Sequence, residues 1–203
     1  MKRIFFAILA LLAFSSPSAF AQSSISSDFD SGAGSSGYLR LGLGAGLTNA
    51  SAPSVDDTGY WGFGMDAAAG VTFAERVRWD VLMVGYSRFD ALGTLEDIPV
   101  SFTVSLLDLQ TAVWIGDFSQ TRRLHPYIGA SIGSARYSEF DDVYWGFAWG
   151  AGAGFEYQVT SHLAIGPRYM FRQALLEYTV GPNTHGFNLN THELTLSIVW
   201  NGD

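Results

Sequence analysis

Residues Trp145 to Tyr157 read WGFAWGAGAGFEY. Every second residue of this stretch is apolar, and the residues between them are glycines, Ala148 and Glu156. A period of two is the side-chain period of a β-strand, because successive residues of a strand point to opposite faces. The stretch therefore predicts a strand with one apolar face and one face of small and charged residues.

The same alternation recurs along the chain from Tyr38 onward, and no segment shows the 3.6-residue period of an amphipathic helix. The predicted strands cover residues 38–48, 61–73, 77–89, 107–115, 127–135, 145–157, 163–172 and 192–200. Residues 102–106 alternate in the opposite phase to 107–115, which predicts a bulge or loop boundary near Leu106. Pro167 cannot donate to a strand ladder and therefore predicts an edge or a bulge.

The predicted connections between strands alternate in length. Those after the first, third, fifth and seventh strands are long and those after the second and sixth are short, with 116–124 as the exception. Barrels of the bacterial outer membrane have longer outer loops and shorter periplasmic turns. The alternation therefore favours a membrane barrel whose long connections lie outside the cell.

The composition is that of one domain without cysteine chemistry. The chain has 203 residues, of which 48% are hydrophobic and 15% are charged, and it contains no cysteine. Disulfide scaffolds, thiolate metal sites and cysteine nucleophiles are therefore excluded. A formal net charge of −8 also argues against a nucleic-acid partner, which requires a basic surface.

The N-terminus has the three parts of a secretory signal. Lys2 and Arg3 precede an apolar run over 4–14, and the small-residue motif Ala19-Phe20-Ala21 follows. The apolar run is shorter than the roughly 20 residues that span a bilayer. We expect residues 1–21 to be a signal peptide that is cleaved before Gln22.

Two further regions follow the signal. Residues 22–37 are rich in serine and glycine and are expected to form a flexible tail, and residues 38–203 form the barrel domain. Cleavage would leave nine arginines and 19 acidic residues, a charge of −10, with no lysine.

Side-chain size and charge assign the two faces of the strands. The apolar face carries large aromatic residues near the strand ends, as in the aromatic girdles at the two membrane interfaces. These are Trp61, Phe73, Trp79, Phe89, Trp145, Tyr157, Phe171 and Trp200. The opposite face holds most of the glycines, which leave room inside a narrow cylinder. The apolar face is therefore predicted to face lipid.

The inner face also carries nearly all the strand charges, five of each sign. They are Arg40, Arg78, Arg88, Arg168 and Arg172, and Asp66, Asp80, Asp108, Glu156 and Glu193. An unpaired charge is costly where water is scarce, whereas guanidinium groups satisfy carboxylates through charge-assisted hydrogen bonds. We therefore expect these ten residues to form an ion-pair network in the lumen.

Strands can span a bilayer only as a closed barrel, because hydrocarbon offers the backbone no hydrogen-bond partners. The predicted fold is all-β, an eight-stranded antiparallel up-and-down transmembrane β-barrel. An eight-stranded barrel is just wide enough for side chains to fill. An open passage for solutes is therefore not expected.

The stretch 38–200 resembles the small outer-membrane barrel family of Gram-negative bacteria, which includes opacity-protein-like and immunogenic surface proteins and has the architecture of the OmpA-type barrel. The residues that carry the resemblance are Tyr38–Gly42, His125–Gly133, Trp149–Tyr157 and the last strand from His192. The resemblance implies an outer-membrane location and a role in envelope integrity, surface exposure or adhesion. It implies as partners the outer-membrane lipids, lipopolysaccharide and the barrel-assembly machinery.

The assembly signal of such proteins resembles an alternating apolar last strand that ends in an aromatic residue. Leu194, Leu196, Ile198 and Trp200 match this pattern, but Asn201, Gly202 and Asp203 follow the aromatic residue here, whereas the family more often stops on it.

Two alternatives to a structural or surface role remain open: a narrow porin-like channel and a lipid-modifying enzyme. His192 and Glu193 are adjacent near the outer rim, but neighbouring strand residues point to opposite faces and cannot easily pair. The Gly-x-Gly-x-Gly runs at 42–46 and 150–154 lack the helix that a phosphate-binding loop requires. We therefore predict no catalytic, cofactor-binding or metal residues.

The predicted outer loops are acidic. They contain Asp56, Asp57, Asp90, Glu96, Asp97, Glu139, Asp141, Asp142 and Glu177. These residues are either simply solvated or form cation-bridged contacts with lipopolysaccharide or basic partners. An extracellular partner is not identified by the sequence.

Overall fold

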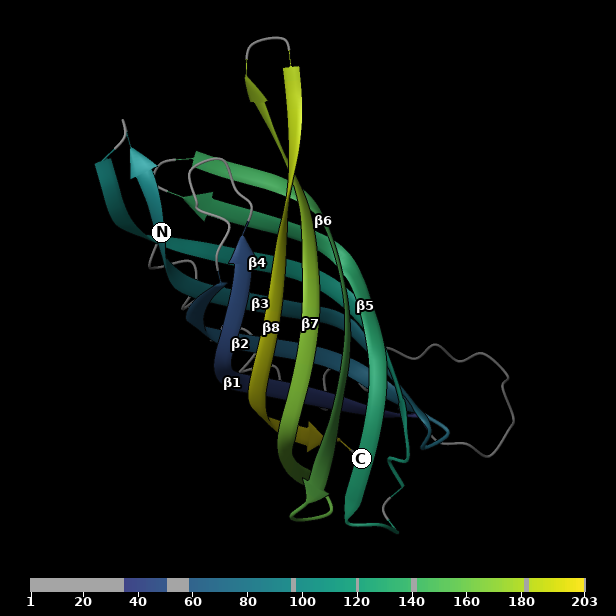
Figure 1. Cartoon of the computed structure of the whole chain (residues 1–203). Helices are drawn as coiled ribbons and strands as arrows, with labels where there is room; N and C mark the ends of the chain where they lie inside the picture. The colour runs from purple at the N-terminus through teal and green to yellow at the C-terminus, as the bar shows by residue number, and fades with distance from the viewer. Residues whose placement is uncertain are drawn as a thin grey trace, which may run out of the picture.

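The computed structural model describes residues 35–50, 59–95, 98–119, 121–139, 142–180 and 183–202. Each strand pairs antiparallel with the next, and the last pairs with the first, which closes a barrel (Figure 1). The strands are β1 (Ser36–Ala50), β2 (Gly59–Phe73), β3 (Val77–Leu95), β4 (Ile98–Gly116), β5 (Leu124–Glu139), β6 (Asp142–Gln158), β7 (Leu163–Val180) and β8 (Asn183–Asn201). The predicted eight-stranded up-and-down barrel is confirmed. Within the described ranges, no helix is long and apolar enough to cross a bilayer.

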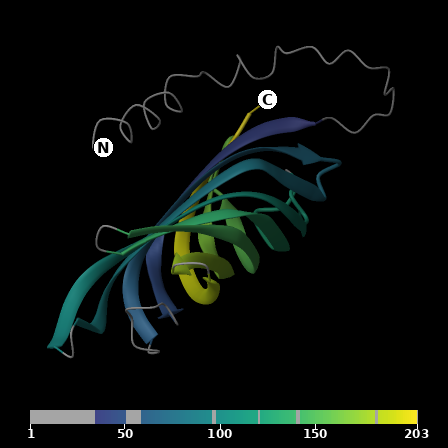
Figure 2. The same cartoon turned by 90° about the horizontal axis from the view of Figure 1, so that it is seen from above.

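The expected signal peptide, residues 1–21, lies outside the described residues, as does 22–34 of the expected tail. Ser36 and Gly37 belong to β1 rather than to the tail. The Gly202 amide donates to the Gly37 carbonyl at 2.7 Å, so the C-terminal end of the chain lies beside the start of β1. Figure 2 shows the purple start of β1 next to the yellow C-terminal end of the chain.

The two ends of the barrel differ. We call the end with the turns 74–76, 117–123 and 159–162 the turn end, and the opposite end the loop end. Most of the connections predicted to be long are continued strand pairs: β3 and β4 reach Leu95 and Ile98. In Figure 1 the ends of β7 and β8 project beyond their neighbours. The predicted loops were too long because the apolar residues of these extensions point into the barrel and their outward residues are mostly polar, so the alternation that marks a membrane strand fades there.

A bulge in β3 reverses the predicted face of its second half. The register shifts between Asp80 and Met83, and Val81 and Leu82 are both exposed, by 52% and 45%. One extra residue moves every later side chain to the other face. Phe89, predicted for the aromatic girdle, is therefore buried in the barrel.

The bulge predicted near Leu106 is not found. β4 keeps one register with β5 from Val104 to Gly116, and Val104, Leu106 and Asp108 are all buried on the inner face. The apolar alternation changes phase in the sequence because the inward residues of β4 change from charged to apolar toward the loop end.

Pro167 causes neither an edge nor a bulge. It pairs with Leu196 of β8, and the register with β6 is the same on both sides of it. The ladder to β6 is interrupted between the Gly154–Arg168 and Tyr157–Ile165 pairs. The missing N–H of proline therefore falls where this ladder makes no pair.

The outer surface of the barrel is apolar. Leu41 is 58% exposed and Trp61 is 73% exposed, whereas Arg40 is buried. Trp61 and Trp145 lie toward the loop end, and Trp79 and Trp200 lie toward the turn end. Aromatic residues at both ends of an apolar surface mark the two membrane interfaces.

Candidate functional site

The lumen of the barrel holds the predicted charges in three groups along its axis. The group nearest the turn end is one ion pair, in which Arg78 Nη1 lies 2.6 Å from Glu156 Oε2. The Arg78 guanidinium also lies over the rings of Phe118, at 4.1 Å, and Tyr38, at 4.9 Å. We call this pair the inner ion pair.

The middle group joins two arginines and two aspartates and is called the central ion cluster. Arg40 Nη2 donates to Asp80 Oδ2 at 2.7 Å, and its Nε lies 3.6 Å from Asp66 Oδ1. Arg168 pairs with Asp66. Asp66 therefore joins two guanidinium groups that would otherwise repel each other.

Aromatic side chains complete the central ion cluster. The indole N–H of Trp114 donates to Asp80 Oδ2 at 2.8 Å, and the Tyr38 hydroxyl donates to the same carboxylate. The Arg40 and Arg168 guanidinium groups lie 5.3 Å and 5.6 Å from the Trp114 ring centre. A buried indole of this kind gains both a hydrogen-bond acceptor and cation–π contacts.

The third group, the outer ion triad, consists of Arg172, Asp108 and Glu193. Arg172 Nη1 donates to Asp108 Oδ2 at 2.6 Å, and its Nη2 donates to Glu193. The Ser87 hydroxyl also donates to Glu193. One guanidinium is thus shared by two carboxylates.

Glycines provide the space for these charges. A Cβ atom on Gly42 would overlap the Asp66 carboxylate, and one on Gly85 would overlap both Arg172 and Asp108. A Cβ on Gly64 would lie 3.1 Å from Glu193 Cδ. The glycines at alternate positions of the sequence therefore leave the space that the ion pairs occupy.

Arg88 is the one predicted network residue that the structure places elsewhere. It is exposed on the outer surface, because the β3 bulge turns it away from the lumen. The prediction for Arg88 is therefore wrong, and so is the predicted balance of charge. Of the ten predicted residues, four arginines and five carboxylates remain inside, and the shared guanidinium of the outer ion triad accounts for the excess carboxylate.

The part of the lumen nearest the loop end is filled by an apolar group that we call the outer apolar cluster. Its buried members are Tyr60, Phe89, Ala91, Val104, Leu106, Ala135, Tyr137, Ala148, Ala174, Leu176, Phe187 and Leu189. The Phe187 ring meets those of Tyr137 and Tyr144 edge-on, with centroids 5.6 Å and 5.3 Å apart. Sequence reasoning missed this cluster, although Val104 and Leu106 in phase with Asp108 would have indicated it.

The residues weighed for catalysis lie apart. His192 is on the outer side, where its Nδ1 lies 2.7 Å from the Tyr169 hydroxyl, whereas Glu193 is buried in the lumen. As expected for neighbouring residues of a strand, the two side chains point to opposite sides. His125 is buried, and its Nδ1 lies 2.6 Å from the Asp117 carbonyl oxygen.

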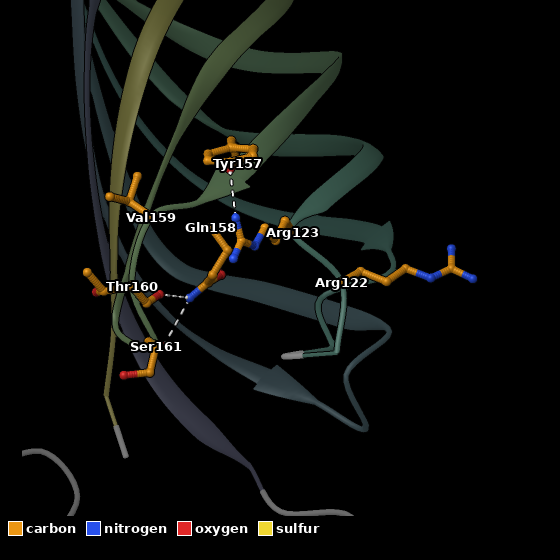
Figure 3. Close-up of a pocket in the computed structure, with 7 residues that line it drawn as sticks. All are labelled: Arg122, Arg123, Tyr157, Gln158, Val159, Thr160 and Ser161. Atoms are coloured by element: carbon orange, nitrogen blue, oxygen red, sulfur yellow. Dashed lines mark hydrogen bonds between the residues drawn. The ribbon is translucent and has the colours of Figure 1, made fainter.

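A pocket of about 310 Å³ opens at the turn end (Figure 3). Arg123 donates to the Tyr157 hydroxyl at 3.5 Å, and the Gln158 amide donates to the Ser161 carbonyl at 3.0 Å. Arg122 forms an ion pair with Asp117 at 3.3 Å. Hydrogen bonds from Ser119 lower the pKa of the Asp117 carboxyl, so this carboxylate keeps its charge further into the acidic range than a free aspartate does. The bond from Arg123 to Tyr157 links the turn 117–123 to the end of β6, and the other two contacts are local to one turn each.

The acidic residues of the loop end are only partly described. Asp56, Asp57, Glu96, Asp97 and Asp141 lie outside the described residues. Asp90, Asp142 and Glu177 are exposed, but Glu139 is buried and accepts a hydrogen bond from Tyr137 at 2.7 Å. Among the residues that the structure describes, no group of three or more His, Asp or Glu side chains could hold a metal ion.

Comparisons with known proteins agree with this architecture. A family model described as the outer membrane protein beta-barrel domain matches residues 6–201. The crystal structure of Neisserial surface protein A (NspA), from Neisseria, superposes with a TM-score of 0.58 at 17% identity, over 82% of this chain and 98% of that one. The outer membrane protein OprG from Pseudomonas aeruginosa superposes with a TM-score of 0.50 at 10% identity, over 82% and 95%. At these identities the likeness shows the fold alone. No curated protein matches the sequence.

Proposed function

The chain belongs to the outer membrane protein β-barrel family, and from this premise we propose that it is a structural and surface-interaction protein whose lumen is sealed by its own side chains. Family and fold place it in the outer membrane of a Gram-negative cell. The predicted resemblance and location are thereby confirmed. The sealed lumen and the surface role are the proposal.

The observation that carries the proposal is that side chains of two kinds fill the lumen in succession. The three groups of ion pairs come first from the turn end, and in the central group Trp114 and Arg168 are at most 1% exposed. The outer apolar cluster follows, with Leu189 and Tyr137 completely buried. An ion entering from the loop end would have to leave water and pass this apolar layer, in which Tyr137 holds the buried Glu139, before it reached the ion pairs, which is costly.

This arrangement predicts that the purified, refolded protein conducts no ions. In planar bilayers we expect no reproducible current steps, because neither level leaves a continuous water path. A conducting porin in the same bilayers serves as the insertion control, and a heat-modifiable gel band shows that the inserted protein is folded. Reproducible current steps that depend on the folded protein would contradict the sealed lumen and favour the narrow porin-like channel.

We also propose that the protein is not an enzyme. The outward His192 is hydrogen-bonded to Tyr169 and contacts the Phe171 ring at 5.2 Å, a setting that suits an interfacial side chain. The carboxylate next to it in sequence, Glu193, is held by Arg172 and Ser87 inside the barrel. A lipid-modifying role through this pair is therefore not supported.

The partners that we propose are outer-membrane lipids, including lipopolysaccharide, the barrel-assembly machinery during insertion, and an extracellular partner at the loop end. The outward residues of the last strand support a contact with the assembly machinery. Leu194, Leu196, Ile198 and Trp200 are all exposed on β8, as an alternating apolar recognition strand requires. The exposed acidic residues at the loop end are proposed to be solvated.

A further inference from the structure

A polar row crosses the outer surface of β3, β4 and β5. Arg88 of β3 lies opposite Ser105 of β4, and Ser105 lies opposite Ser138 of β5. Arg136 is two residues from Ser138 on the same strand and therefore on the same face. The residues between these positions, among them Leu106 and Tyr137, are buried in the barrel, so the row points outward.

The two arginines of this row have no ion-pair partner among the acids that the structure describes. Among the described residues, neither Arg88 nor Arg136 forms an ion pair, in contrast to the four arginines of the lumen. Asp90, two residues from Arg88 on the same face, accepts a hydrogen bond from Thr103 at 2.8 Å, and Glu177 lies opposite Trp145 on the far side of β6. The Ser138 hydroxyl is buried and has no hydrogen-bond partner.

Aromatic residues place the row at the depth of lipid headgroups. The Arg136 guanidinium lies 5.9 Å from the ring centre of Trp145, its neighbour on β6. Arg88 lies opposite Phe63, two residues from the exposed Trp61. Tryptophan in a membrane barrel marks the interface, where a charged side chain is tolerated far better than at the bilayer midplane.

From this row we propose that Arg88 and Arg136, with Ser105 between them, bind a phosphate group of the phosphorylated glycolipid of the outer leaflet, the lipid A part of lipopolysaccharide. Adjacent strands are about 4.8 Å apart, so β3 and β5 lie about 10 Å apart, a distance across which the long side chains of Arg88 and Arg136 can converge on one phosphate. Guanidinium forks match phosphate oxygens, and hydroxyls donate to the oxygens that remain. The inference rests on the proposed function, because the loop end must face outward.

Native mass spectrometry of the folded protein in a neutral detergent, incubated with lipid A, tests the site. We expect the wild type to bind bisphosphorylated lipid A at least tenfold more tightly than its dephosphorylated form or phosphatidylglycerol. The double variant Arg88→Gln/Arg136→Gln should lose at least tenfold in lipid A affinity, because both guanidinium groups are gone. The matched control Arg122→Gln/Arg123→Gln removes the same charge at the turn end and should bind as the wild type does.

Three outcomes would overturn the site. They are unchanged binding by the double variant, an equal loss in the turn-end control, and equal binding of phosphatidylglycerol. A heat-modifiable gel band confirms that each variant is folded before it is compared. Failure of the lipid site while the wild type remains non-conducting would leave the sealed lumen intact, so the two proposals fail separately.

Discussion

Replacing Arg172 with methionine is expected to lower the free energy of unfolding by about 3–5 kcal/mol, the usual effect of removing one partner of a buried ion pair. Arg172 is buried and is the only arginine that pairs with Asp108 and Glu193 among the described residues. The variant would leave two carboxylates together in the lumen. Urea unfolding of the refolded protein in vesicles, followed by tryptophan fluorescence, measures the change.

Two matched variants separate this effect from the loss of an arginine as such. Arg88→Met removes the same side chain from the exposed face of β3 and should change stability by less than about 1 kcal/mol. Glu193→Gln removes the excess carboxylate and leaves one guanidinium for one aspartate, so it should cost far less than Arg172→Met. A larger loss of stability from Arg88→Met than from Arg172→Met would mean that the second half of β3 turns Arg88 into the lumen.

Replacing Gly44 with alanine is expected to destabilise the closing seam of the barrel, at the upper end of the range of about 1–3 kcal/mol for over-packing. A Cβ atom at this position would lie 2.6 Å from Thr195 Cα and 2.8 Å from the Leu194 carbonyl carbon. Both are backbone atoms of β8, the strand that closes the barrel on β1. No side-chain rotation can relieve that contact, so the two strands must separate.

The folded fraction after refolding, read from the heat-modifiable gel band, reports the effect of Gly44→Ala. Gly37→Ala is the matched control on the same strand, because a Cβ there would meet only the Gly70 carbonyl oxygen at 3.9 Å. We expect Gly37→Ala to refold like the wild type and Gly44→Ala to refold poorly. Equal folded fractions would show that β1 and β8 do not approach as closely as the structure has them.

The architecture was predictable because one physical pattern determines it. Alternation along β6, from Trp145 to Tyr157, indicates a strand with an apolar and a small face, and the bilayer then requires closure. The same pattern placed ten charged residues on the inner face, and the structure pairs nine of them there, among them Arg40 and Arg168.

Two features could not be predicted: the bulge that shifts the register of β3, and the apolar character of the lumen near the loop end. The sequence around Val81 and Leu82 has two adjacent apolar residues but nothing that requires a bulge, and the position of Arg88 depends on that bulge alone. In sequence, apolar residues that point into the barrel near Leu106 give the same pattern as lipid-facing residues of a strand whose register is shifted by one residue. Only the pairing of β4 with β5 distinguishes the two.

The bulge in β3 and the inward position of Leu106 both have functional consequences. The bulge takes Arg88 from the lumen to the outer surface, where it joins Arg136 at the interface. The inward phase at Leu106 adds an apolar layer above the ion pairs. The proposed seal and the proposed lipid contact both depend on features that the alternation alone assigned to the wrong face.

The face assignment of β8 gives the most direct test of the whole arrangement. The chain has no cysteine, so a spin label on Leu196→Cys reports that site alone. Leu196 is 55% exposed and its neighbour Ser197 is fully buried in the lumen. In bilayers we predict that the label at 196 collides with oxygen far more than with a water-soluble nickel chelate, and that Ser197→Cys resists a water-soluble maleimide until the protein is unfolded. A label at 196 that meets the nickel chelate more than oxygen would contradict an apolar surface turned toward lipid around a filled, charged interior.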